Sequence, residues 1–274
     1  MKKRFSYIPA VFLVMLLIVP LSVAAQDKEA FKKEHFIKGA DTLNYRILFP
    51  KDFSEEKKYP VVLFLHGAGE RGNNNESQLT HGSKLFLEKR EEFPAIVIFP
   101  QAPQKEYWAK VEVERDSIPF KFNFKNEEEP TKALHLVMAL LNSVISEEYV
   151  DTNRIYVGGL SMGGMGTFEI LSRKPDLFAA AFTICGGANP GIVKNYPQGF
   201  NVWIFHGEKD DVVLPEYSKN MAREINSHGG NAKLSLYPND NHNSWDSAFA
   251  EPYLLPWLFS HERTEKKTTT EFVN

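Results

Sequence analysis

Ser161 lies in a short glycine-rich pattern whose residue types suit nucleophilic catalysis. Residues 159–163 read Gly-Leu-Ser-Met-Gly, a G-x-S-x-G pattern. The pattern follows an apolar run at 155–157 and precedes a helical segment at 162–173, which is the context that such a serine needs. In a sharp turn from strand to helix, glycine neighbours relieve crowding, and the helix N-terminus favours a developing negative charge. The sequence therefore predicts that Ser161 is a nucleophile rather than an ordinary serine in a turn.

A serine hydroxyl is a weak nucleophile unless a general base takes its proton. His242 follows the last apolar run and precedes the last helical segment, so we predict that it is this base. Two other histidines also lie downstream of the serine. His228 stands at the end of a helical segment, where a capping role is favoured, and His261 adjoins the polar C-terminal tail.

Besides a nucleophile and a base, this chemistry needs a carboxylate that orients the base and stabilises its charged form. An apolar run at 202–205 leads directly into a turn that holds two neighbouring aspartates. Because a carboxylate just past a strand lies at the edge where the serine is expected, either could serve. We choose Asp210, and Asp211 stays open as the alternative.

Two backbone amides are needed to stabilise the negative oxygen of the reaction intermediate. One is expected from Met162, the residue after the nucleophile. The other is expected from Ala68, in the glycine-rich loop 66–72 that follows an earlier apolar run. His66 opens this loop, and we favour a hydrogen-bonding role that shapes the loop over a catalytic role.

The remaining pattern consists of apolar strand-like runs that alternate with helical segments. Such alternation predicts an α/β fold, a doubly wound, mostly parallel sheet in a single domain. The alternating segment 43–49 is expected to be a half-buried edge strand. The other expected strands are 61–65, 95–99, 154–158, 180–184, 202–205 and 234–237, and the expected helices are 131–149, 162–173, 216–228 and 244–259.

Residues 104–129 interrupt this rhythm, because connections in α/β units are usually ~2–6 residues long. The segment is rich in aromatic and charged residues. It is either a surface insertion with a small cluster of its own or a wall over a substrate pocket. Trp108 and Trp245 could stack on a substrate or pack in the core, and Glu70 could touch the substrate.

Composition excludes several classes of function. The chain has 274 residues, of which 43% are apolar and 24% charged, as in globular proteins. Its net charge of -3 provides no basic excess for nucleic-acid binding. The single cysteine, Cys185, excludes an internal disulfide and cysteine-rich metal sites, and we expect it to be buried. No metal-ligand spacing or nucleotide fingerprint is present, so no metal and no cofactor are expected.

The N-terminus has the pattern of a secretory signal peptide. A basic start at 1–4 precedes an apolar run at 10–19, and small residues precede Gln26. We predict a signal peptide at 1–25, a hydrolase-type domain at 26–262 and a disordered tail at 263–274. The expected location is secreted or periplasmic, with no membrane contact after cleavage, although an uncleaved membrane anchor is the alternative.

Four motifs together resemble the α/β-hydrolase superfamily. They are residues 66–72, residues 159–164, the pattern His206-Gly207-x-x-Asp210-x-x-Val213, and His242-x-x-Trp245. Within the superfamily, the chain from 43 to 259 is similar to secreted bacterial esterases of the polyhydroxybutyrate depolymerase, feruloyl esterase and dienelactone-hydrolase-like group, some of which are named predicted peptidases. The resemblance implies a triad of Ser161, Asp210 and His242, with Ala68 and Met162 as oxyanion donors.

These observations predict a serine hydrolase that acts on carboxylic esters through an acyl-enzyme. The resemblance and the export signal suggest acyl or feruloyl esters of plant polysaccharide, or other small esters. A serine peptidase on the same fold is the first alternative, because ester and amide cleavage share this chemistry. A non-catalytic binding protein on a hydrolase scaffold is the second.

Overall fold

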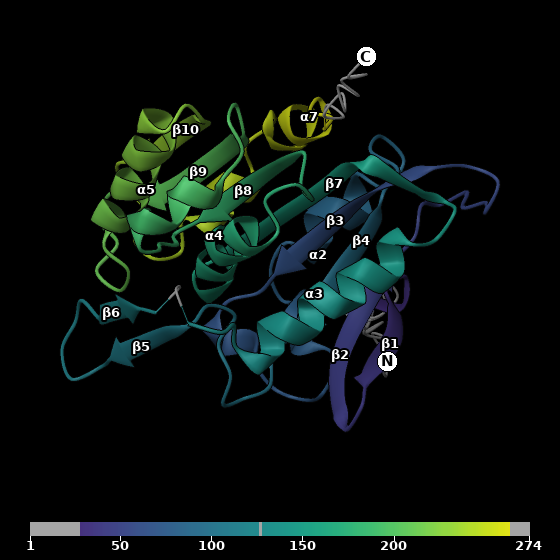
Figure 1. Ribbon diagram of the computed structural model, residues 1–274, viewed down its shortest axis with the longest axis horizontal. Helices are drawn as coiled ribbons and strands as arrows, with labels where there is room; N and C mark the ends of the chain where they lie inside the picture. Colours follow the sequence, from purple (N-terminus) through teal and green to yellow (C-terminus); the bar gives the residue numbers. More distant parts are fainter. Residues whose placement is uncertain (1–27, 126–127, 264–274) are drawn as a thin grey trace, which may run out of the picture.

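The computed structural model describes residues 28–125 and 128–263 of the chain. The signal peptide expected at 1–25 and residues 264–274 of the expected tail lie outside the described residues. One eight-stranded sheet runs through the molecule (Figure 1). In spatial order its strands are β1 (Lys32–Lys38), β2 (Asp41–Leu48), β4 (Ile96–Gln101), β3 (Tyr59–Leu65), β7 (Val150–Leu160), β8 (Ala180–Ile184), β9 (Asn201–Gly207) and β10 (Asn231–Tyr237).

The sheet is mostly parallel, as the sequence predicts. β4, β3, β7, β8, β9 and β10 run in one direction, while β2 pairs antiparallel with both β1 and β4. The expectation that 43–49 forms the edge strand is wrong, because β1 lies outside β2. Most β1 side chains are exposed, so this strand lacks the apolar pattern that would have predicted it.

Helices cover both faces of the sheet, which explains why the central strands are apolar at nearly every position. On one face, α3 (Lys132–Ile145), α4 (Met162–Arg173) and α5 (Pro215–Ser227) pack against Leu63, Leu65 and their neighbours (Figure 1). On the other face, α2 (Ser83–Glu88), α6 (Trp245–Phe249) and α7 (Leu254–Phe259) pack against Phe64 and Val62. The described residues also form three short 3-10 helices: η1 (Ala68–Glu70), η2 (Ser77–Leu79) and η3 (Pro190–Asn195).

The C-terminal region differs from the sequence-based expectation of one helix at 244–259. Two short helices, α6 and α7, replace it. The break falls at residues 250–253, where Pro252 disfavours helical geometry in the residue before it. Near the last described residue, Tyr156 Oη donates to the backbone carbonyl of His261 at 2.7 Å.

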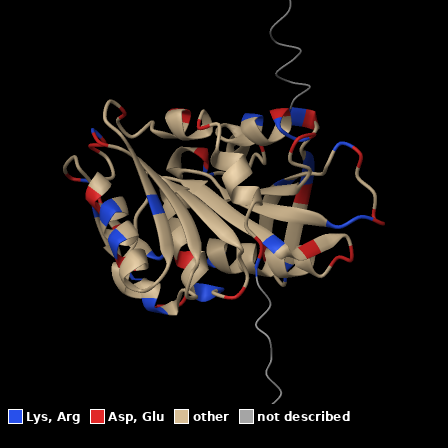
Figure 2. Ribbon diagram, turned by 90° about the horizontal axis from the view of Figure 1, so that it is seen from above, with Lys and Arg blue, Asp and Glu red and all other residues tan. Residues whose placement is uncertain are grey.

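Charged side chains lie mainly on helices, loops and strand ends, and the middle of the sheet is largely free of them (Figure 2). Within the described ranges, no helix combines the length and apolarity that crossing a membrane requires. The parallel strands all deliver their carboxyl ends to the same edge of the sheet, as the register of β7 with β8 and of β8 with β9 shows. This edge therefore collects the loops that carry the polar motifs.

The long connection between β4 and α3 folds into a hairpin, β5 (Val111–Glu114) and β6 (Lys121–Phe124), which stands apart from the main sheet (Figure 1). Phe122 and Phe124 pack edge-on against Tyr217 of α5. The backbone N–H of Phe120 donates to Val212 O at 3.2 Å. The hairpin thus has its own apolar cluster and is also fastened to the loop after β9.

A close contact between α4 and β3 sets the position of the first turn of α4. A Cβ atom placed on Gly163 would lie 1.9 Å from the carbonyl oxygen of Leu65. This distance is far inside any van der Waals contact, so only glycine permits the observed approach of helix to strand.

We predict that Gly163→Ala lowers the free energy of unfolding by about 3 kcal/mol or more, because the added methyl meets rigid backbone. Gly69→Ala is the matched control, since a Cβ there meets nothing within 4 Å, and it should change stability by less than about 0.5 kcal/mol. Urea unfolding followed by circular dichroism measures both. Equal stabilities of the two variants would contradict the role of this contact.

Candidate active site

Ser161 stands in the sharp turn between β7 and α4. Its backbone angles, φ 52° and ψ −117°, lie in a region that non-glycine residues rarely adopt. Such a conformation costs about 1–3 kcal/mol and persists only where the surroundings impose it. Here the Ser161 N–H donates to Ile184 O at 2.8 Å, and its carbonyl accepts from Met165 N at 3.0 Å. The turn presents the hydroxyl above the carboxyl edge of the sheet, as the G-x-S-x-G pattern predicts.

His242 lies beside this hydroxyl. Its Nε2 is 3.0 Å from Ser161 Oγ, and its Nδ1 is 2.8 Å from Asp210 Oδ2. The ring packs edge-on against Trp245, with centroids 5.6 Å apart. The structure therefore brings together three residues that the sequence places in separate loops, in the geometry of a nucleophile, a base and an orienting acid.

Asp210 is buried and its carboxylate is saturated with donors. Oδ1 accepts from the backbone amides of Val212 and Val213, both at 2.9 Å. Burial alone would raise the pKa of this carboxyl group, but hydrogen bonds from His206 and His242 hold its pKa well below the usual range. Asp210 is therefore ionised at neutral pH, whereas Asp211 is exposed and contacts the histidine loop through its backbone amide.

His206 is a member of this site to which the sequence assigned no role. Its side chain is fully buried, and Nε2 lies 2.8 Å from Val213 O and 3.2 Å from Asp210 Oδ2. Both partners accept only, so Nε2 carries the proton. Nδ1 lies 2.7 Å from Ser218 Oγ on α5. The sequence feature that could have indicated this role is the His206-Gly207 pair shortly before Asp210. The pair is recognisable as a motif, but the sequence does not reveal which side chain His206 contacts.

The acid loop and the histidine loop are held against each other through their backbones. A Cβ on Gly207 would lie 2.4 Å from the carbonyl oxygens of both Asp240 and Asn241. Lys209 N also donates to Asp240 O at 3.0 Å. The position of His242 therefore depends on the conformation of the loop that carries Asp210.

Ala68 and Met162 border the same small pocket as Ser161 and His242. Met162 is the first residue of α4 and Ala68 the first of η1, so neither amide has an acceptor within its own helix. Arg71 Nε donates to Ala68 O at 2.8 Å and so steadies this loop. The two residues are placed where amide donors for an oxyanion are expected.

His66 lies beneath the loop and is fully buried. Its Nε2 accepts from Ala102 N at 3.0 Å, so the ring proton is on Nδ1, which donates to Gly67 O at 2.6 Å. Burial lowers the pKa of His66 to about 4, which keeps the ring neutral. His66 thus holds the loop in shape, the interpretation that the sequence favoured.

The three residues expected to contact the substrate, Trp108, Trp245 and Glu70, do not line the pocket beside Ser161. Trp108 is fully buried and its indole N–H donates to His66 O at 3.0 Å, so it is a core residue and not an aromatic wall. The sequence could not distinguish these roles, because both need a large apolar ring. Trp245 contacts His242 and His81, and the largely buried Glu70 lies 3.7 Å from His81 Nε2.

The pocket beside Ser161 has a volume of about 80 Å³. Its outer wall comes from the insertion, which contributes Tyr107, Arg115, Phe120 and Phe122. Phe120 and Phe122 belong to the aromatic residues that made 104–129 a candidate wall, whereas the sequence did not single out Tyr107 and Arg115. The other lining residues are Ala68, Ser161, Met162, Met165, Val212, Val213 and His242.

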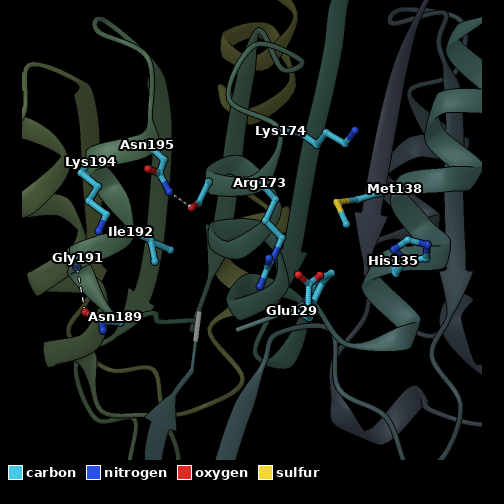
Figure 3. A pocket seen from close by; sticks show the side chains of 12 residues that line it. Glu129, His135, Met138, Arg173, Lys174, Asn189, Gly191, Ile192, Lys194 and Asn195 are labelled. Atoms are coloured by element: carbon cyan, nitrogen blue, oxygen red, sulfur yellow. Dashed lines mark hydrogen bonds between the residues drawn. The ribbon is translucent and has the colours of Figure 1, made fainter. Parts of the chain in front are cut away.

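A larger hollow of about 740 Å³ lies elsewhere, between the C-terminal end of α4, the start of α3 and η3 (Figure 3). Arg173, at its centre, is paired with Glu169 at 2.7 Å. Arg173 is twelve positions after Ser161, which is ~18 Å along a helix at 1.5 Å per residue. This hollow is therefore separate from the triad.

Cys185 is buried beside the triad, and its sulfur lies within 4.8 Å of ligand atoms of Asp210 and His242. Burial raises the pKa of the thiol well above its usual value, so the sulfur stays protonated and is a poor metal ligand. The atoms of Asp210 and His242 are already hydrogen bonded to each other. The cluster is better explained by packing under the catalytic loops than by metal binding.

Comparison with known proteins identifies the family of this chain. The model of the phospholipase/carboxylesterase family matches residues 53–252. The chain belongs to this family. It is similar to lysophospholipase-like protein 1 of Mus musculus, with 26% identity over 197 residues that cover 66% of this chain and 79% of the relative. It is also similar to acetylxylan esterase A of Aspergillus awamori, with 28% identity over 141 residues that cover 45% of this chain and 44% of the relative.

Among solved structures, the crystal structure of a thermostable esterase is similar to this chain, with a TM-score of 0.77 and 32% identity. The alignment covers 87% of this chain and 64% of that one, so the chain spans less than two thirds of this esterase and less than half of the acetylxylan esterase. Membership in the phospholipase/carboxylesterase family confirms the predicted α/β-hydrolase fold and the assignment to hydrolases of the esterase group.

The buried ring of His66 predicts a pH dependence of stability. Its folded pKa of about 4 lies below the ordinary value of 6.5, so the unfolded chain binds a proton first as pH falls. Stability should therefore decrease by about 3 kcal/mol between pH 6.5 and pH 4, and should show no contribution from this ring above pH 7.

Unfolding by urea at a series of pH values measures this effect, with His66→Gln as the comparison. The variant lacks the titrating ring, so its stability should fall less steeply over the same pH range. Parallel pH profiles for the two proteins would show that His66 is not the group responsible.

Proposed function

We propose that this protein is a serine carboxylesterase that cleaves esters of short acyl groups. The observation that carries the proposal is the chain of hydrogen bonds from Ser161 Oγ through His242 to the buried Asp210, next to a pocket bordered by Ala68 and Met162. Family membership supports ester hydrolysis in general. The roles of the individual residues and the size of the acyl group belong to the proposal.

In the first half of the proposed reaction, Ser161 Oγ attacks the ester carbonyl while His242 Nε2 takes its proton. The carbonyl oxygen becomes negative and accepts from the amides of Ala68 and Met162. The bond between the carbonyl carbon and the alcohol oxygen then breaks, and the imidazolium gives its proton to the leaving alcohol. Asp210 holds the proton of His242 on Nδ1 and stabilises the imidazolium.

In the second half, water adds to the acyl-enzyme. His242 takes a proton from the water as the water oxygen bonds to the acyl carbon, and the same two amides donate hydrogen bonds to the carbonyl oxygen that becomes negative. The bond to Ser161 Oγ then breaks, the serine regains a proton from His242, and a carboxylic acid leaves. No cofactor enters this scheme, because His242 carries out every proton transfer while Asp210 holds it in place.

The pocket volume supports a short acyl group. At about 80 Å³ it is well below the ~300–1,000 Å³ typical of sites for drug-sized ligands. An acetyl group suits such a space, whereas a feruloyl group would require the hairpin to move. The similarity to an acetylxylan esterase points the same way, and acetyl groups on polysaccharide are our proposed natural substrates. The N-terminal pattern supports action outside the cytoplasm, after removal of 1–25.

Ser161→Ala should abolish hydrolysis of p-nitrophenyl acetate, with a fall in kcat of at least about 10⁴-fold, because the nucleophile is lost. A fluorophosphonate probe should label the wild type and not the variant, as mass spectrometry of the intact protein would show. Retention of both activity and labelling in a correctly folded variant would exclude Ser161 as the nucleophile.

Phe122→Ala should relax the limit on acyl length. Removing the ring enlarges the pocket, and each methylene newly buried should gain about 0.8 kcal/mol, or roughly fourfold in kcat/KM. The matched control is Phe124→Ala. Phe124 lies on the same hairpin strand as Phe122 and also contacts Tyr217 of α5, but it does not line the pocket.

Rates with p-nitrophenyl acetate, butyrate and hexanoate measure the preference for acyl length. The wild type and Phe124→Ala should favour acetate, and Phe122→Ala should shift towards the longer esters. The same profile in all three proteins would exclude the hairpin as the wall that limits the acyl group.

A further inference from the structure

The hairpin carries one arginine, Arg115, whose charge is not paired with a carboxylate of the described residues, unlike the charges of three nearby lysines. Three lysines of the insertion each pair with a glutamate: Lys110 with Glu128 at 3.6 Å, Lys121 with Glu114 at 3.7 Å, and Lys125 with Glu112 at 3.7 Å. Across the described residues, Arg115 has no such carboxylate partner.

Arg115 is instead held in place by aromatic residues of the pocket. Its guanidinium lies over the ring of Phe120, 4.9 Å from the centroid, and Nη2 donates to Tyr107 Oη. Arg115, Tyr107 and Phe120 all line the pocket beside Ser161. An arginine held by a ring and a hydroxyl keeps its full charge and most of its hydrogen-bond donors for a further partner.

A second guanidinium increases the positive potential at this point. Arg71 lies over the ring of Tyr107, the tyrosine whose hydroxyl accepts from Arg115, with its guanidinium carbon 5.0 Å from the ring centroid. Its hydrogen bonds go to the backbone carbonyls of Ala68 and Glu106, which carry no net charge. Within the described part of the chain, Arg71 also forms no ion pair with a carboxylate.

We propose that Arg115 binds a carboxylate on the substrate, so that the enzyme prefers short-chain esters whose alcohol part is anionic. The guanidinium would donate two parallel hydrogen bonds to the carboxylate, as the planar fork of arginine favours. Tyr107 Oη accepts from Arg115 and keeps its own proton to donate to the same group, while Arg71 adds attraction over a longer range. This inference rests on the proposed esterase function and specifies its substrate class.

The location of the charge favours the alcohol part of the ester over the acyl part. A short acyl group would fill the pocket of about 80 Å³, and Arg115 is exposed at its rim. A carboxylate on the alcohol would therefore meet the guanidinium where solvent already reaches it. Because the arginine remains partly hydrated, the interaction should be moderate and sensitive to salt.

The test compares acetyl esters that differ in charge at one end. The anionic substrates are 3- and 4-acetoxybenzoate, and their methyl esters are the neutral counterparts. The measured quantity is the ratio of kcat/KM for the anionic ester to that for its neutral counterpart. Dividing the wild-type ratio by the Arg115→Gln ratio cancels the intrinsic reactivity of each leaving group.

We expect this quotient to be about fivefold or more for at least one isomer at low salt, with a decrease in 0.5 M NaCl. Arg115→Lys should retain part of the preference, because it keeps the charge but loses the planar fork. Lys121→Gln is the matched control: it removes one positive charge from the same hairpin, from a lysine paired with Glu114, and should leave the ratio as in the wild type.

A quotient near one for both isomers, with acetate hydrolysis intact, would overturn the role of Arg115 and leave the proposed esterase function standing. An equal loss of preference in Lys121→Gln would also overturn it, because the effect would then reflect only the general charge of the hairpin. Absence of serine-dependent hydrolysis of every ester would instead overturn the proposed function and this inference together.

Discussion

The site depends first on the close approach of α4 to β3. Gly163 permits this approach, because any Cβ at that position would overlap the carbonyl group of Leu65. The contact brings the first turn of α4, with Ser161 and the amide of Met162, next to the loop that begins after Leu65 and contains Ala68. Ser161 and the two amides are thus neighbours through a backbone contact, and the unusual φ of Ser161 is the local strain that accompanies this arrangement.

The buried charge of Asp210 organises the other half of the site. A carboxylate without water needs several donors, and the protein supplies two backbone amides and two histidines. One histidine is His242, and the other, His206, connects the carboxylate region to α5 through Ser218. The ionised Asp210 therefore orients the ring of His242 and also joins the β9 loop, the histidine loop and α5 into one unit.

The insertion is divided from this machinery both in structure and in role. Ser161, Asp210 and His242 come from loops at the carboxyl edge of the main sheet, whereas the outer wall of the pocket comes from the separate hairpin. The hairpin reaches the site through its aromatic residues and through the bond from Phe120 to Val212, two positions after the acid. Its sequence can therefore change the size and charge of the pocket without altering the hydrogen bonds of the triad.

Much of this arrangement could be predicted from the sequence, because it rests on local patterns. Continuous apolar runs indicate strands buried on both faces, the G-x-S-x-G pattern indicates a strand-to-helix turn, and chain order leaves His242 as the best candidate for the base. The edge strand β1 could not be predicted as well, because its side chains are mostly exposed and form no apolar pattern. The division of the last helix into α6 and α7 was also missed, because the effect of Pro252 on a helix boundary depends on packing. The same holds for Trp108, whose burial is invisible in its residue type.

The sequence by itself determined the fold class and the residue types available for catalysis, since these depend on hydrophobic periodicity and on turn chemistry along short stretches of chain. Only the tertiary structure decided between Asp210 and Asp211 as the partner of His242, the second contact of the acid with His206, and the position of Arg115 at the rim of the pocket. These features depend on distances between loops far apart in the chain, and those distances are set by how the sheet edge, α5 and the hairpin pack together.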